Sequence, residues 1–302
     1  MTGFYALTKR NCKLFFKDKG MFITSLITPL ILLVLYVTFL ANVYKSSFVS
    51  ALPEGFAVAD SLINGTVGGQ LVSSLLAVSC VTVAFCTNLL MVQDKATGSR
   101  RDLNMAPVRQ STLALAYFAA SAAATLIINF TALAVCLVYI GVTGWYMTAA
   151  DVLLLALDVF LLTMFGTALS SVINTPLSTN GQGSAVSTIV SAGYGFLCGA
   201  YMPISSFSEG LQKLLSFLPG TYGTSLMRNH ALAGVFREMS ANGVPAEIIE
   251  AFRDSIDCNL YFFGSKVELS AMYIVLIAAV LLFICITVLM NLLKKTRCKN
   301  DS

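Results

Sequence analysis

The sequence predicts an all-α integral membrane protein with six transmembrane helices. Its 302 residues are 57% hydrophobic and 11% charged, whereas a soluble domain carries roughly 25% charged residues. Thirteen of the nineteen Lys and Arg residues lie in three short patches, 9–19, 95–109 and 294–299, separated by stretches long enough to cross a bilayer. Because basic residues in short loops stay in the cytoplasm, both termini and the middle patch are expected there.

Residues 1–19 are expected to form an interfacial helix on the cytoplasmic leaflet. At about 100° per residue, four basic residues gather on one face and apolar residues on the other. The basic residues are Lys9, Arg10, Lys13 and Lys17. Alternatively, the segment is a frayed extension of the first span. The uncharged run 20–44 is too long for the apolar part of a signal peptide and predicts a spanning helix.

The apolar runs and their breaks define the spans, and the whole chain, 1–302, is expected to be one transmembrane domain. The predicted spans are about 21–43, 67–91, 112–141, 151–172, 182–201 and 269–293. A cytoplasmic loop, 94–110, joins the second and third spans. Trp145 and Tyr146 mark the outer end of the third, because such rings favour the membrane interface.

Residues 202–267 are expected to form an external re-entrant helical segment between spans 5 and 6. Four leucines between Leu211 and Leu218 follow an i, i+3, i+4, i+7 pattern, and Pro219 and Gly220 end it. This pattern predicts a short amphipathic helix that can dip back into the outer leaflet. Residues 246–256 predict a second small helix.

Missing motifs exclude several functions. No G-x-x-x-x-G-K-[ST] loop occurs, so this chain is not expected to hydrolyse ATP. His230 is the only histidine, no G-x-S-x-G occurs, and the cysteines lack zinc or disulfide spacing. A catalytic site and a metal site are therefore not predicted. The basic patches fit anionic lipid and a cytoplasmic protein partner, and nothing in them indicates nucleic acid.

Asp158 is the most informative single residue. It lies roughly 10 Å below the outer end of span 4, at about 1.5 Å per residue, and Asp151 projects from nearly the same face. An ionisable group at that depth is costly and usually faces protein or water. Two interpretations stay open. Asp158 is a candidate for the lining of a translocation path, or it forms a structural hydrogen bond with Asn129 or a tyrosine.

Three stretches, in order, resemble the transmembrane permease subunit of type-2 ATP-binding-cassette (ABC-2) transporters, mostly bacterial exporters. The stretch ALTKRNCKLFFKDKGMFITSLITPLILLVLY is similar to the family's basic interfacial helix and proline-containing first span. KATGSRRDLNMAPVR is similar to the segment between spans 2 and 3, with Gly98 and Pro107 matching. GAYMPISSFSEGLQKLLSFLPGTYGTSLMR resembles the end of span 5, the re-entrant helix and a proline–tyrosine turn.

The resemblance implies a role for two of these stretches. Region 94–107 would be a coupling helix seated in a groove of a separate ATPase; the alternative is an ordinary solvated loop. Its candidate residues are Asp94, Lys95, Gly98, Arg100, Arg101, Asp102 and Pro107. Residues 203–222 would form part of an external gate; the alternative is a plain surface helix. The gate residues would be Pro203, Leu215, Pro219 and Tyr222.

The resemblance also implies a complex in a bacterial cell membrane. This permease would pair with a second permease, as a homo- or heterodimer, and with cytoplasmic ATPase subunits. It would bind no cofactor itself, while the partner ATPase would use ATP and Mg. Two other classes stay open: a non-transporting membrane sensor or assembly scaffold, and an integral membrane enzyme. The substrate cannot be read, although an apolar path favours a hydrophobic or amphipathic molecule over a free ion.

Overall fold

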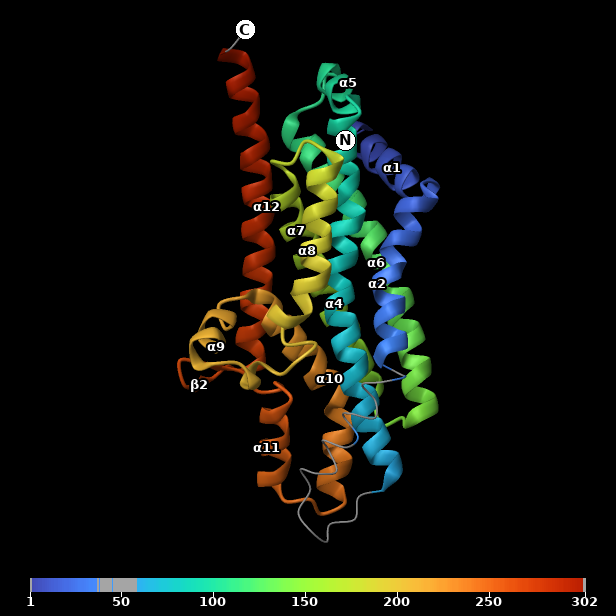
Figure 1. Ribbon diagram of the computed structural model, residues 1–302, viewed down its shortest axis with the longest axis vertical. Helices are drawn as coiled ribbons and strands as arrows, with labels where there is room; N and C mark the ends of the chain where they lie inside the picture. The colour runs from blue at the N-terminus through green and yellow to red at the C-terminus, as the bar shows by residue number, and fades with distance from the viewer. Residues whose placement is uncertain (1, 37, 39–44, 46–58, 301–302) are drawn as a thin grey trace.

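The computed structural model describes residues 2–36, 38, 45 and 59–300, and it confirms an all-α protein apart from one very short hairpin. Most helices run along one long axis (Figure 1). The elements are α1 (Thr2–Lys17), α2 (Lys19–Leu35), α4 (Asp60–Ala96), α5 (Ser99–Met105), α6 (Gln110–Thr143), α7 (Ala149–Asn174), α8 (Asn180–Leu197), η2 (Ile204–Ser206), α9 (Glu209–Leu215), α10 (Pro219–Ala241), α11 (Ala246–Ser255), β1 (Tyr261–Phe262), β2 (Ser265–Lys266) and α12 (Leu269–Asn300). Most of the predicted loop 45–60 and the outer end of span 1 lie outside the described residues.

Several of these helices are candidate membrane spans. Among the described residues, α4, α6, α7 and α12 are long and apolar enough to cross a bilayer. The α1–α2 pair, bent by 75°, would bring the number to five if it is one broken span. The predicted fifth span corresponds to α8, which does not meet the same test because Ser, Thr, Gly, Asn and Gln make up more than half of it.

Helix α4 is the centre of the bundle. Helices α2, α6, α7, α8 and α10 pack around it, and 94% of its most apolar window is buried. A helix that is apolar on all sides is expected to be buried. Several of its buried polar side chains are hydrogen-bonded to neighbouring helices, which offsets the cost of burying them. Asn88 donates to Ser170 and Ser171 at 2.9 and 2.8 Å.

Helix α10 is the one long helix that the sequence analysis did not predict. It begins with Pro219, whose missing N–H is tolerated in the first turn. It packs against α4, α7 and α12, and most of its residues are buried. Because polar and apolar residues alternate around the whole helix, it has no apolar stripe from which a helix is usually predicted. The segment 202–267 is therefore partly an element of the core.

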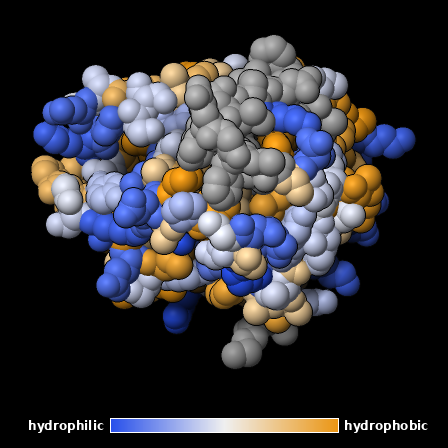
Figure 2. Space-filling model, turned by 90° about the horizontal axis from the view of Figure 1, so that it is seen from below, coloured by the Kyte–Doolittle hydropathy of each residue, from blue (hydrophilic) through white to orange (hydrophobic). Residues whose placement is uncertain are grey.

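The two ends of the bundle carry different small elements. Helix α5 lies at one end, and α9, α11 and the β1–β2 hairpin lie toward the other (Figure 1). Helices α9 and α11 fall where the sequence predicted short helices. The antiparallel hairpin was not predicted; it turns through Phe263 and Gly264, with φ of 48° and 86°. Figure 2 looks onto the α11 end, where hydrophilic side chains are spread widely with hydrophobic ones between them.

Candidate functional site

The predicted coupling region forms the short helix α5 at the end of the bundle. Gly98 is its N-cap, with φ of 86°, a conformation that glycine adopts at the least cost. Helix α5 ends at Met105, because Ala106 precedes Pro107 and is extended, as the residue before a proline tends to be. Pro107 itself is exposed.

The outer face of α5 is accessible. Arg101 and Asp102 are exposed, and Met105 is 86% exposed. Charged and apolar side chains thus lie together on one short helix, as at the surface of a protein that docks a partner.

Asp94, in contrast, points into the subunit. Its carboxylate accepts hydrogen bonds from Arg10 at 2.7 and 3.2 Å and a third from the Tyr117 hydroxyl. This ion pair joins α1 to α4, and Tyr117 adds α6. Of the predicted basic face of α1, Lys9, Lys13 and Lys17 remain exposed. Arg10, in contrast, connects α1 to α4 through its bonds to Asp94.

Lys95 and Arg100 are also engaged within the subunit. Lys95 donates to the carbonyls of residues 174, 175 and 177 at 2.8 to 3.0 Å. It thereby satisfies the carbonyl groups at the C-terminal end of α7, where a cation is favoured. Arg100 lies over the ring of Tyr117, 5.2 Å from its centroid, and donates to Asn291 of α12 at 3.1 Å. These contacts tie the base of α5 to three long helices.

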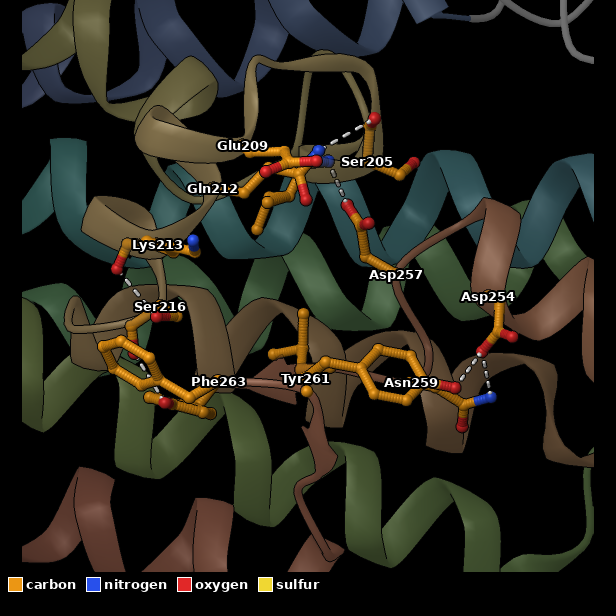
Figure 3. Close-up of a pocket in the computed structure, with 14 residues that line it drawn as sticks. Ser205, Glu209, Gln212, Lys213, Ser216, Asp254, Asp257, Asn259, Tyr261 and Phe263 are labelled. Atoms are coloured by element: carbon orange, nitrogen blue, oxygen red, sulfur yellow. Dashed lines mark hydrogen bonds between the residues drawn. The ribbon is translucent and has the colours of Figure 1, made fainter.

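A pocket of about 660 Å³ opens where η2 and α9 face the segment after α11 (Figure 3). Gln212 and Lys213 of α9 line one side, and Asp254 and Asn259 line the other. Asn259 donates to Asp254 at 2.7 Å. The lining of the pocket therefore carries charges of both signs among apolar and aromatic side chains.

The predicted gate residues lie around this pocket in different environments. Tyr222 lines it, and its hydroxyl donates to the Ser216 carbonyl at 2.5 Å. Leu215 is 1% exposed and belongs to the main hydrophobic core. Pro203 precedes η2, and Pro219 starts α10. Their role in a gate stays a prediction.

A buried ion pair between Arg228 of α10 and Asp257 holds this region together. Arg228 donates to Asp257 at 3.3 Å, to the Ile256 carbonyl at 2.8 Å and to the Gly199 carbonyl. Asp257 also accepts from the Ile204 amide at 2.7 Å. One arginine thus joins α10, the end of α8 and the segment after α11.

Burial dominates the ionisation of the side chains in this segment. It raises the pKa of Asp257, although Arg228 opposes the shift. Burial also raises the pKa of the Cys258 thiol to about 12. Cys258 lies in the segment 202–267, which was predicted to be external, yet it is only 1% exposed. Such a thiol is a poor nucleophile.

Asp158 is buried between α7, α10 and α12. Its carboxylate lies 2.6 Å from His230 Nδ1 and accepts from the Tyr273 hydroxyl at 2.6 Å. A tyrosine was one of the two predicted partners. The other, Asn129, is hydrogen-bonded instead to Ser79 and Thr163 of the neighbouring helices.

Asp151 completes a second contact between α7 and α10. It forms a capping box with Thr148 and an ion pair with Arg237. The hydrogen bond to Asp151 raises the pKa of Arg237. Asp151 and Asp158 are seven residues apart, and so are His230 and Arg237. The two helices therefore meet in antiparallel directions along one face of each.

Sequence reasoning missed Arg228, His230, Arg237 and Asp257 as contact residues. The one available signal was that Asp151 and Asp158, like His230 and Arg237, are separated by seven residues, since residues seven apart share a helix face. That signal required knowing that 219–241 is a helix. Among the described residues, no group of three or more His, Cys, Asp or Glu side chains could hold a metal ion.

The sequence also matches the sequence model of a known protein family. The sequence model of a family described as ABC-2 type transporter matches residues 2–231, which extend from α1 into α10. The match covers well over half of the 302 residues. No curated protein matches the chain.

Proposed function

The chain belongs to the ABC-2 type transporter family, and on that premise we propose that it is the six-span permease of an ATP-driven exporter whose ATPase is a separate subunit. The family and the apolar helices establish a transport permease that is a multi-pass membrane protein. The finer parts of the proposal are the docking of an ATPase at α5, the pairing of two permeases and the bacterial membrane with both termini in the cytoplasm.

The observation that carries the proposal is the contrast between the two faces of α5. Arg101, Asp102 and Met105 are exposed, whereas Asp94, Lys95 and Arg100 at its base bond to other helices. A chain without a phosphate-binding loop needs an external source of ATP hydrolysis. Helix α5 suits the docking of a separate ATPase, because its outer face is exposed while its base is bonded to other helices.

The contacts at the base of α5 suggest how a push on it would reach the spans. Asp94 links α4 to α1 and α6, and Lys95 links it to the end of α7. Arg100 links α5 to α12. A displacement of α5 by the ATPase would therefore act on several helices together, as coupling through packed elements requires.

Helix α8 supports the pairing of two permeases. It packs mainly against α4 and leaves much of its surface exposed. Ser184, Thr188 and Ala192 are exposed at four-residue intervals, so they share one face. Small residues permit close approach of a second helix in a bilayer. We place the transport path beside this face, between two copies or relatives.

Charge reversal at α5 tests the proposal. In the Arg101→Glu/Asp102→Lys variant, an ATPase that co-purifies with the tagged chain from its native membrane should be lost. Disrupting a close charged contact at an interface costs about 2–5 kcal/mol, enough to be seen in a pull-down. Since the ATPase is cytoplasmic, its binding at α5 would also fix the orientation.

The matched control is Lys213→Glu, which reverses an exposed charge at the other end of the bundle. It should leave the complex intact. Unchanged recovery of the ATPase and unchanged ATP hydrolysis in the α5 variant would reduce this segment to a solvated loop and overturn the docking proposal.

A further inference from the structure

A second pocket, of about 490 Å³, lies between α10, α11 and the first residue of α12. Three basic side chains line it, His230 and Arg237 from α10 and Arg253 from α11, and none of the described Asp or Glu residues does. It is distinct from the pocket of Figure 3, which is lined by acidic and basic groups. Its lining therefore selects for negative charge.

Arg253 is held in place but incompletely paired. Its Nη2 donates to the Asn229 side chain at 2.8 Å, and its guanidinium lies over Phe236, 5.1 Å from the ring centroid. Its Nε is buried and has no hydrogen-bond partner among the described residues. The Nη2 bond to Asn229 is to a neutral amide, so the guanidinium charge can still bind an anion that reaches its terminal nitrogens from the pocket.

The other two basic side chains already have acidic partners behind the pocket. Arg237 pairs with Asp151, and His230 Nδ1 bonds to Asp158 at 2.6 Å. Glu250, near Arg253, is itself paired with Lys266. Arg253 itself forms no ion pair with another described residue. The pocket thus fits a ligand with a single negative charge.

The position of the pocket indicates an amphiphile. Helices α7 and α12, both candidate spans, begin beside it at residues 149 and 269. Phe236, Ile249 and Leu269 supply an apolar wall. Leu154, 38% exposed, lies on α7 between the two paired aspartates. A basic pocket at the depth where spans begin, beside apolar surface, matches an acidic headgroup with its chain alongside.

We propose that this pocket binds one singly charged phosphate or carboxylate group of an amphiphile at the outer membrane interface. Arg253 forms a charge-assisted hydrogen bond with the acidic group through a terminal guanidinium nitrogen. Arg237 and the free Nε2 of His230 approach it from the α10 side. Two sources share this chemistry, an anionic lipid of the bilayer and a free anion.

Native mass spectrometry of the full chain in detergent tests the proposal. Short-chain phosphatidylglycerol is titrated into the protein, and short-chain phosphatidylcholine, which has no net charge, serves as the control in a parallel titration. Inorganic phosphate is then added as a competitor. Ser240 is exposed on the pocket rim, so Ser240→Asp adds a negative charge without removing any side-chain hydrogen bond of the structure. It should weaken one phosphatidylglycerol site about tenfold or more.

The controls separate charge from folding. Ser240→Asn, of the same size as the aspartate, should bind as the wild type does. Arg253→Gln should lose the same site, while Arg109→Gln, which removes an exposed arginine at the α5 end, should keep it. Other phosphatidylglycerol adducts, such as those on the basic face of α1, remain in every variant.

The competitor identifies the source. Retention of the lipid assigns a headgroup site that also needs the chain, as proposed. Displacement of the lipid by inorganic phosphate would overturn the amphiphile and leave a free-anion site. Equal binding of phosphatidylcholine and phosphatidylglycerol would overturn the proposal. So would phosphatidylglycerol binding that Ser240→Asp leaves unchanged.

Discussion

The two ends of the bundle hold their charges differently. At the α5 end, the Arg10 side chain is 32% exposed and pairs with Asp94 at the edge of the helices. At the α10–α11 end, Arg228 and Asp257 are 2% and 6% exposed and lie inside the protein. The first pair connects elements that are already packed, whereas the second is surrounded by the elements it joins.

This difference matters for both stability and function. An ion pair with a partly exposed member, such as Arg10 with the buried Asp94, contributes less because water screens it and the side chains lose freedom. A buried pair has lost its hydration, so removing one partner leaves an uncompensated charge. We therefore expect the α5 end to tolerate substitutions and keep its function in its exposed face. The α10–α11 end should be sensitive to single changes that touch no ligand.

The largest effect is expected for Arg228→Met. It removes the donors to Asp257, Ile256 and Gly199 and leaves a buried carboxylate without its cation, although the Ile204 amide still donates to it. The expected loss is about 3–5 kcal/mol of unfolding free energy, measured as a lower melting temperature in detergent. The double variant Arg228→Met/Asp257→Leu should be more stable than Arg228→Met alone. A melting temperature of Arg228→Met equal to that of the wild type would contradict the role of Arg228 in joining α10, the end of α8 and the segment after α11.

Asp158 is the next test, because it belongs to the α10 contacts yet lies within a span. With two hydrogen bonds to His230 and Tyr273, Asp158→Leu should lower stability by about 1–3 kcal/mol by leaving those partners unsatisfied. Asp158→Asn preserves size and should be mild. Melting temperature and ATP hydrolysis by the purified complex should be measured for both.

The same pair of variants distinguishes packing from a transport path. Normal ATP hydrolysis and transport by Asp158→Asn, together with an unstable Asp158→Leu, would leave only the packing role. A stable Asp158→Asn variant that hydrolyses ATP without transporting would assign Asp158 to the path. Tyr273→Phe, which removes one of the two bonds and keeps the ring, is the matched control for packing.

The elements that could be predicted from the sequence are those marked by clustered basic residues or by apolar runs. Clusters of Lys and Arg located α1 and α5, and apolar runs located α4, α6, α7 and α12, because each pattern repeats over neighbouring residues. Helix α10 could not be found this way, since most of its residues are buried and polar and apolar residues are mixed around it.

The contacts of the candidate site depend on residues far apart in the chain. Arg228 and Ser74 are 154 residues apart, and His230 and Asp158 are 72 apart. Asp94 and Lys95 were identified as charged residues of a cytoplasmic loop, but their inward direction follows from the rotation of α4 about its axis. That rotation is fixed by packing and cannot be read from one helix alone.

A smaller effect is expected at the α5 end. Arg10→Gln removes the ion pair with Asp94, but the Tyr117 hydroxyl still donates to the same carboxylate. Because the Arg10 side chain is a third exposed, the loss should be about 0.5–1 kcal/mol, and high salt should diminish it. Melting curves at low and high salt provide the measurement. A loss as large as that of Arg228→Met would show that the two ends do not differ.

The smallest effect, and the only one that depends on pH, is expected for Glu250 at the surface of the α10–α11 end. The hydrogen bond from Lys266 lowers the pKa of Glu250 below its ordinary value of 4.5. A carboxylate whose folded pKa is lowered adds stability above its unfolded pKa, and that stability is lost as the pH falls through the folded pKa. Both side chains are nearly half exposed, so the contribution should be about 0.2–1 kcal/mol.

The melting temperature of the wild type should therefore fall slightly more steeply below pH 4.5 than that of Glu250→Gln, while the two curves run parallel from pH 6 to 8. Parallel curves over the whole range would mean that this exposed pair contributes nothing. A difference in melting temperature as large as that caused by Arg228→Met would contradict the expectation that exposure, more than the number of charges, sets the strength of these contacts.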